Sequence, residues 1–258
     1  MTKLANRVNE VAFFKRMVMG EESQRILLVQ AESGYGKTGL MGRFASECPK
    51  CAIAVDIDLK DARDSGILYV FRRARKLLGK EYFSEFDHII QQFQPRKNDI
   101  HIQGNRLCGD GNQIKVVLQD VSAEERQERL DCLQEAFFED LLNHPSPIVF
   151  ILDTFNAATA ELQEQISGKF LVNVADNRRL RAVVAGSKVP QPSSTWQRYH
   201  HLFPLGPIHE HEAWCEFATL SGFRFDPGQV RVIVAGCRGV PGDILKFFEA
   251  ADRGMNQL

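Results

Sequence analysis

The chain has 258 residues, of which 44% are hydrophobic and 25% charged, and its formal net charge is −1. This composition is typical of a globular protein, and the balanced charge indicates no generally basic surface, so we expect no nucleic-acid partner. The amino-terminal MTKLANRVNEV lacks the apolar core of a secretory signal, and no stretch approaches the roughly 20 apolar residues that span a bilayer. Because six cysteines without a signal are typical of reduced thiols, we expect a cytoplasmic protein with no membrane contact.

Short apolar runs alternate with helical patterns along most of the chain. The first pattern predicts a helix over 8–19 whose inward face carries Val8, Val11, Phe14, Met17 and Val18. Strands that alternate with helices predict a parallel sheet covered on both faces, and therefore an α/β fold. The further predicted elements are, in chain order, a strand at 25–30, a helix at 37–45, a strand at 51–57, a helix ending at Leu78, a helix at 80–93, a helix ending near His144, a strand at 147–155, a helix at 158–175, and strands at 179–186 and 201–207.

Two of these helices carry start signals. Asp64 or Ser65 is placed to cap the helix that ends at Leu78. Ser122 and Glu125 have the spacing of a capping box, which predicts the start of the helix that ends near His144.

Two segments depart from the alternating pattern. Residues 100–119 alternate apolar and polar positions on both sides of Gly-Asp-Gly-Asn, which predicts a hairpin inside an insertion at about 80–120. After Pro207 no strand pattern recurs, and residues 209–252 predict three short helices broken by glycine and proline. We therefore expect a core domain over 1–207 and a small helical lid over 208–258.

The stretch 26-ILLVQAESGYGKTGLMGRF-44 nearly matches the phosphate-binding loop G-x-x-x-x-G-K-[ST], with Ala31 in place of the first glycine. Such a loop points successive backbone N–H groups at a phosphate, at the start of a helix. The lysine, here Lys37, adds charge at the β- and γ-phosphates and serves catalysis, and the Thr38 hydroxyl joins Mg²⁺. An ordinary glycine-rich turn is the alternative. The residues expected to bind nucleotide here are Ser33, Gly34, Tyr35, Gly36, Lys37, Thr38 and Gly39.

A second acidic element is expected at the end of a neighbouring strand. The apolar run IVFIL leads directly to Asp153, as in a Walker B strand. A carboxylate there suits Mg²⁺, a hard cation that binds oxygen and keeps several waters. We therefore expect Asp153 to bind the metal together with Thr38 and to take part in catalysis, although an aspartate that only caps the following turn is an alternative.

Taken in order, these motifs resemble the STAND NTPases, a branch of the AAA-like P-loop ATPases. ANRVNEV is similar to the family's F-x-N-R-x-x-E stretch, ILDTFNAAT to its Walker B strand, and RAVVAGSKVP to its sensor strand. CRGVPGDILKFFEAA is similar to the Gly-x-Pro motif of the family's helical lid, with Gly239 and Pro241 in place. The resemblance covers nearly the whole chain, and the phosphate loop is its most specific part.

The resemblance implies a regulatory ATPase that acts as a nucleotide-dependent switch in signalling or prokaryotic defence. It further implies Mg²⁺ with ATP or ADP as cofactor, and a homo-oligomer or a protein effector or sensor as partner. It adds Arg7, Lys188 and Pro241 to the expected nucleotide contacts. The family usually continues past the lid, so these residues are either a short switch or part of a longer protein.

Two departures from the family pattern bear on catalysis. Asn156 stands where a catalytic glutamate is usual, and an amide can hold a water but cannot accept its proton. Lys188 stands where arginine is usual, and lysine lacks the planar fork that holds phosphate through two bonds. Together with Ala31 these departures predict slow hydrolysis, that is, a weak ATPase.

Two alternatives remain open. The first is a pseudo-ATPase, an interaction module that binds nucleotide without hydrolysis, which Asn156 favours. The second is a P-loop kinase, which needs clustered arginines over its substrate. The nearest cluster, Arg72, Arg73 and Arg75, fits the solvated face of an amphipathic helix more simply, with an inward face of Tyr69, Val70, Leu77 and Leu78.

Overall fold

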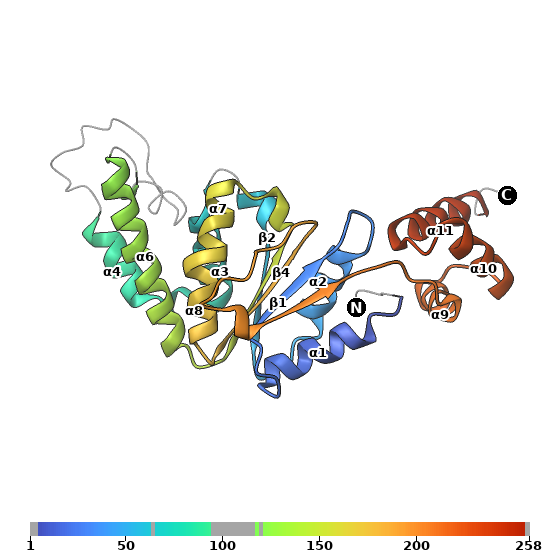
Figure 1. Cartoon of the computed structure of the whole chain (residues 1–258), viewed down its shortest axis with the longest axis horizontal. Coiled ribbons are helices and arrows are strands. Elements are labelled where there is room, and N and C mark those ends of the chain that lie inside the picture. Colours follow the sequence, from blue (N-terminus) through green and yellow to red (C-terminus); the bar gives the residue numbers. More distant parts are fainter. Residues whose placement is uncertain (1–4, 63–64, 94–116, 119–120, 256–258) are drawn as a thin grey trace.

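The computed structural model describes residues 5–62, 65–93, 117–118 and 121–255. Its centre is a sheet of five parallel strands in the order β2-β3-β4-β1-β5 (Figure 1). This arrangement confirms the predicted α/β fold with a parallel sheet. The strands are β1 (Ile26–Gln30), β2 (Ile53–Asp58), β3 (Ile148–Asp153), β4 (Leu180–Gly186) and β5 (His200–Pro204).

Helices cover both faces of the sheet. Alternate residues of a strand point to opposite faces, and every residue of β3 and β4 is buried. Val149 and Ile151 face helices α1 (Val8–Met19) and α2 (Lys37–Ser46). The apolar cluster on the other face includes side chains of α3 (Ile67–Leu78), α6 (Ala123–Asn143), α7 (Ala160–Gln165) and α8 (Leu171–Asp176), and of α4 (Ser84–Gln92), which packs against α6.

Two helices bury a different set of side chains from the set predicted. Val8 is 63% exposed because residues advance about 100° around a helix, which leaves it at the edge of the stripe formed by Val11, Phe14 and Val18. In α3, Leu77 is 43% exposed, whereas Arg75 is buried and forms an ion pair with Asp87 of α4. The prediction of Arg75 on a solvated face was therefore wrong, because a helix packed beside α3 supplies a carboxylate partner.

The caps and the predicted long helix were partly right. Ser122 accepts a hydrogen bond from the Glu125 N–H at the start of α6, which is one half of the predicted capping box, whereas the Glu125 carboxylate pairs with Arg129. By contrast, α3 follows Gly66 and has no side-chain cap, so the prediction for Ser65 was wrong, and Asp64 lies outside the described residues. The helix predicted over 158–175 is split into α7 and α8 by a wider turn at Ile166–Phe170, where Gly168 leaves the helical conformation. The predicted hairpin also falls outside the described residues, apart from 117 and 118.

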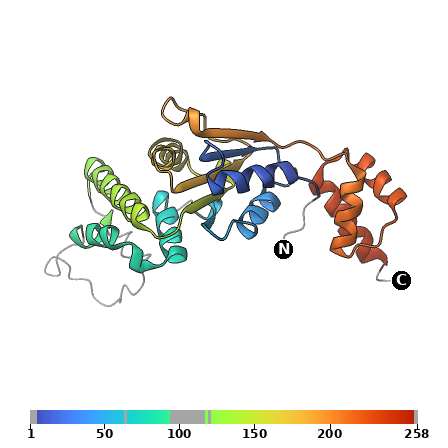
Figure 2. The same cartoon turned by 90° about the horizontal axis from the view of Figure 1, so that it is seen from below.

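Three helices form a small bundle at one end of the molecule, opposite α4 and α6 (Figures 1 and 2). They are α9 (His211–Ser221), α10 (Pro227–Gly236) and α11 (Pro241–Met255), as the sequence predicts. They enclose an apolar core of their own that includes Trp214, Val230 and Phe248. We call α9–α11 the helical bundle; the boundary between the predicted domains at 207 and 208 stays a prediction. None of the helices described is both long and apolar enough to cross a bilayer.

The short single-turn segments complete the fold. They are 3-10 turns that connect the main elements, at Leu59–Ala62, Lys80–Tyr82, Phe155–Ala157 and Gln197–Tyr199.

Candidate functional site

The loop between β1 and α2 has the backbone of a phosphate-binding loop. Gly34 and Gly36 have φ values of 89° and 84°, in the left-handed region that only glycine adopts readily. Ala31, by contrast, is outside that region, and its N–H donates to the carbonyl of Gly186 at 3.1 Å. The alanine therefore replaces the usual glycine without backbone strain.

Lys37 begins α2 and folds its side chain back over the loop. Its Nζ donates to the carbonyl oxygens of Ala31 at 2.6 Å and Glu32 at 2.8 Å. Burial lowers the pKa of Lys37, while the charges of Asp153 and Glu32 act in the opposite direction. An ammonium group in this position, at the start of a helix, attracts anions.

Asp153 ends β3 and is 6% exposed. Its Oδ1 accepts a hydrogen bond of 2.7 Å from the N–H of Thr154, a β-branched residue held at φ 60°. This is the turn-capping contact considered for Asp153, and the same side chain also lines a cavity together with Lys37 and Thr38. The strand register places a second carboxylate, Asp58, opposite Asp153 at the end of β2, which the sequence analysis did not single out.

Asn156 follows Asp153 and joins the ends of β3 and β4. Its Oδ1 accepts a hydrogen bond of 2.9 Å from the Ser187 N–H. A Cβ at Gly186 would lie 2.3 Å from the Lys188 carbonyl oxygen and 3.1 Å from Asn156 Oδ1, so only glycine allows this approach. Both Asn156 and Ser187 line the cavity. Lys188 does not, and it is exposed.

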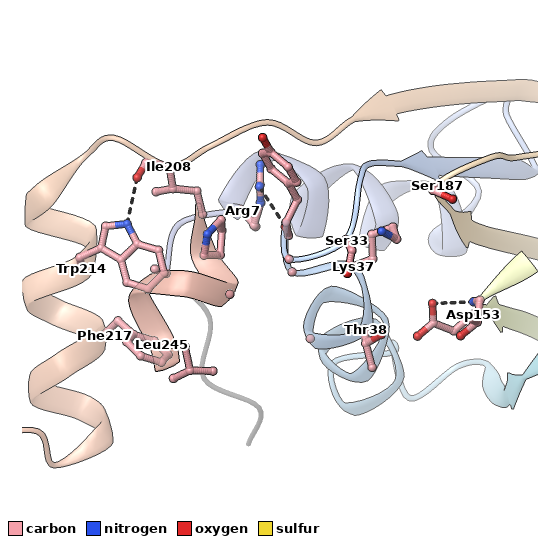
Figure 3. Close-up of a pocket in the computed structure, with 18 of the residues that line it drawn as sticks. Arg7, Ser33, Lys37, Thr38, Asp153, Ser187, Ile208, Trp214, Phe217 and Leu245 are labelled. Carbon is pink, nitrogen blue, oxygen red and sulfur yellow. Dashed lines mark hydrogen bonds between the residues drawn. The ribbon is translucent and has the colours of Figure 1, made fainter. Parts of the chain in front are cut away.

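Arg7 lies between the phosphate loop and the segment that leads into the helical bundle. Its guanidinium donates to the carbonyl oxygen of Tyr35 at 3.4 Å (Figure 3). It also donates to the Gly206 carbonyl oxygen at 2.7 Å and pairs with Glu10 at 3.3 Å. Arg7 therefore lines the cavity, and it also ties the loop to the segment that leads into α9.

The cavity between the core and the helical bundle has a volume of about 560 Å³. Figure 3 shows Lys37 and Thr38 between Asp153 on one side and the side chains of the bundle on the other. One end of the cavity is thus polar, and the other end is apolar. The apolar end is lined by Ala5, Ile208, Trp214, Phe217 and Leu245.

The structure brings most of the predicted site residues to this one cavity. Its wall also includes Ser33, Gly34, Tyr35, Gly36, Gly39 and Pro241. Trp214, Phe217 and Leu245 were not predicted as site residues, because aromatic and apolar residues on helices are usually core residues. Trp214 is indeed 3% exposed, and its indole N–H donates to the Ile208 carbonyl at 3.0 Å.

The site can supply few protein ligands to a metal ion. Thr38 and Asp153 both line the cavity, and no cluster of three His, Cys, Asp or Glu residues gathers anywhere in the described part of the chain. Such a donor set fits Mg²⁺, which is often bound by one or two protein oxygens while phosphates and waters complete its shell.

Comparisons with known proteins bear on the fold. No protein-family model and no curated protein sequence matches the chain. The structure of the Orc1 protein of Aeropyrum pernix in complex with DNA aligns with all of this chain and 62% of its own, at 14% identity and a TM-score of 0.51. The RuvB Holliday junction branch migration motor of Thermotoga maritima aligns over 95% of this chain and 61% of its own, at 12% identity and a TM-score of 0.42. The chain thus spans less than two thirds of either structure, and its fold, a parallel sheet covered by helices on both faces, is similar to that of the Orc1 structure.

Proposed function

We propose that the protein is a regulatory ATPase that holds Mg²⁺ with ATP or ADP in this cavity and hydrolyses ATP slowly. The observation that carries the proposal is the continuity of the cavity, which joins the phosphate loop and Asp153 to the apolar wall of the helical bundle. Its polar end suits the phosphates and its apolar end suits a base, because ligand sites combine apolar walls with a few placed polar groups.

The side chains divide the chemistry among them. Lys37 and the loop N–H groups bind the β- and γ-phosphates, and Thr38 and Asp153 would hold Mg²⁺, which when bound offsets phosphate charge. Asn156 can orient a water, because an amide oxygen has two lone pairs and Ser187 N–H engages one of them. Hydrolysis would be slow, since no amide can take the water's proton.

The finer assignment rests on the resemblance to the STAND NTPases. The helical bundle lies beside the phosphate loop, which supports a lid over 208–258 and a core over 1–207 that respond to the nucleotide. We propose that this response acts as a switch in signalling or prokaryotic defence, in the cytoplasm, with a second copy or a protein effector as partner. The Orc1 structure holds DNA, so the fold comparison gives no support to excluding nucleic acid, and that exclusion is not part of the proposal.

The alternative with most support is a pseudo-ATPase, which Asn156 favours. The kinase alternative loses support, because Arg75 of its arginine cluster is buried in an ion pair with Asp87. The test is calorimetric titration with ATP and ADP, with and without Mg²⁺, followed by single-turnover hydrolysis. We expect binding of both nucleotides and slow turnover; binding without turnover would favour the pseudo-ATPase, and the absence of binding would contradict both.

The apolar end of the cavity makes a separate prediction. Leu245 lines it from α11 and is 37% exposed, so its replacement disturbs little of the bundle core. Leu245→Glu is expected to lower ATP affinity at least about tenfold, because apolar contact with the base is lost and a carboxylate enters the cavity that holds the phosphates.

The matched control is Phe247→Glu, which adds the same charge to the same helix. Phe247 is 51% exposed and does not line the cavity. We expect it to leave ATP affinity unchanged in the same titration. Equal losses in the two variants would show that Leu245 has no contact with the nucleotide.

A further inference from the structure

The carbonyl groups of the phosphate loop are held from several sides. Lys37 holds those of Ala31 and Glu32, Arg7 reaches that of Tyr35, and the N–H of Gly242 in the helical bundle donates to that of Gly34 at 2.7 Å. A peptide group is planar, so a carbonyl fixed on one side points the N–H of the next residue to the opposite side. The bond from Gly242 therefore orients the N–H of Tyr35, and the bond from Arg7 orients that of Gly36.

Gly242 is free to make this bond because of its position in α11. The first N–H groups of a helix have no acceptor within the helix, and Pro241, at the first position, has no N–H at all. The two N–H groups that follow that of Gly242, those of Asp243 and Ile244, both donate to the Val240 carbonyl oxygen at 3.1 Å. The N–H of Gly242 instead points outward, and the loop carbonyl of Gly34 caps it.

The contact between the two glycines is also sterically close. A Cβ at Gly242 would lie 2.9 Å from the Cα and 3.0 Å from the carbonyl oxygen of Gly34, so any larger residue would push α11 away from the loop. A Cβ at Gly34 would in turn meet Val240 at 3.5 Å. That second contact is an ordinary one with a side chain, whereas a Cβ at Gly242 would meet backbone atoms, which cannot yield by rotating a side chain.

We propose that Gly242 is a positioning residue for phosphate, so that the seated helical bundle completes the phosphate loop. The proposal rests on the proposed function and adds its regulation: a bundle pulled off the loop leaves the Gly34–Tyr35 peptide unrestrained and lowers affinity for phosphate. Coupling between two equilibria is reciprocal, so bound phosphate also favours the seated bundle. The helical bundle thus controls the binding of the diphosphate group of the ligand as well as the binding of its base.

Inorganic pyrophosphate is the probe, because it lacks a base and cannot touch the apolar wall of the bundle. The test compares pyrophosphate and ATP affinities of the wild type, Gly242→Ala and Gly236→Ala. Gly236 is a fair control, since it ends α10 and a Cβ there would have no atom within 4 Å. Alanine raises helix propensity at both positions, so a loss of affinity that occurs only in Gly242→Ala cannot come from helix propensity.

We expect Gly242→Ala to weaken pyrophosphate and ATP alike, by about tenfold or more, the scale of one hydrogen bond to a charged group, and Gly236→Ala to change neither. Hydrogen exchange at residues 33–36 should quicken in Gly242→Ala while β3 stays protected, which separates a displaced bundle from an unfolded chain. If β3 also loses protection, an ester in place of the Pro241–Gly242 amide replaces it as the variant, because the ester removes the N–H that donates to Gly34 and adds no Cβ, and the same loss of pyrophosphate affinity is expected.

Two results would overturn the inference while leaving the proposed function intact. One is a loss of ATP affinity with unchanged pyrophosphate affinity, which would mean that the bundle only covers the base. The other is unchanged affinity for both. A wild type that binds neither ligand would overturn the proposed function itself, and this inference with it.

Discussion

Replacing Lys37 with alanine is expected to lower ATP affinity by at least about 100-fold, the scale of one or two hydrogen bonds between charged groups in a partly buried site. The Lys37 ammonium lies on the loop carbonyls of Ala31 and Glu32, at the start of α2. The γ- and β-phosphates would lose the loop's own cation, and no backbone N–H replaces a full charge. Calorimetric titration with Mg²⁺–ATP measures the effect.

Lys188→Ala is the matched control for this prediction. Lys188 was expected to contact nucleotide, but it is exposed and does not line the cavity. We therefore expect its removal to change ATP affinity less than about threefold, as for a solvent-screened charge. An unchanged ATP affinity in Lys37→Ala would contradict the assignment of the phosphate loop. Equal losses of ATP affinity in the two variants would indicate that the change in net charge, and not a contact of Lys37 with phosphate, lowers the affinity.

Asn156→Glu is expected to accelerate ATP hydrolysis by about 100-fold, the low end of what a positioned general base contributes. The Asn156 side chain already lies in the cavity wall with Asp153, and its oxygen accepts the Ser187 N–H. A carboxylate there can accept both that bond and a proton from water, whereas the amide can accept only the bond. Single-turnover hydrolysis at saturating ATP measures the change.

Asn156→Gln is the control, because glutamine has the length of glutamate without a proton acceptor. It should stay as slow as the wild type. Asp153→Asn should instead weaken Mg²⁺-dependent binding and turnover together, since it removes charge from the cation's shell. If Asn156→Glu binds ATP and gains no rate, the water site is absent and the pseudo-ATPase is the better description.

The fold was predictable because its signals are local. Each buried strand is a short apolar run, and the loop between β1 and α2 carries its glycines, lysine and threonine on consecutive residues. Parallel pairing then follows, since helices connect the strands and the carboxyl ends of parallel strands meet at one edge of the sheet. That edge brings Asp153 near Lys37, although more than a hundred residues of sequence separate them.

Side chains whose surroundings come from other elements were predicted less well. Arg75 has the spacing of an exposed residue, yet α4 packs against it and supplies Asp87. Lys188 follows a buried strand as a sensor residue does, yet it is exposed and does not line the cavity. Helical spacing shows which residues share a face but not what will cover that face.

The sequence by itself determined the parallel sheet, the phosphate loop and the carboxylate that ends β3, because adjacent residues encode each of them. Only the tertiary structure decided how the helical bundle meets that loop. The apolar wall of Trp214, Phe217 and Leu245 and the bond from Gly242 to Gly34 join segments about two hundred residues apart. Such contacts cannot be predicted from periodicity or residue spacing, because they depend on where the helical bundle after β5 packs and on the absence of a side chain at Gly34 and Gly242.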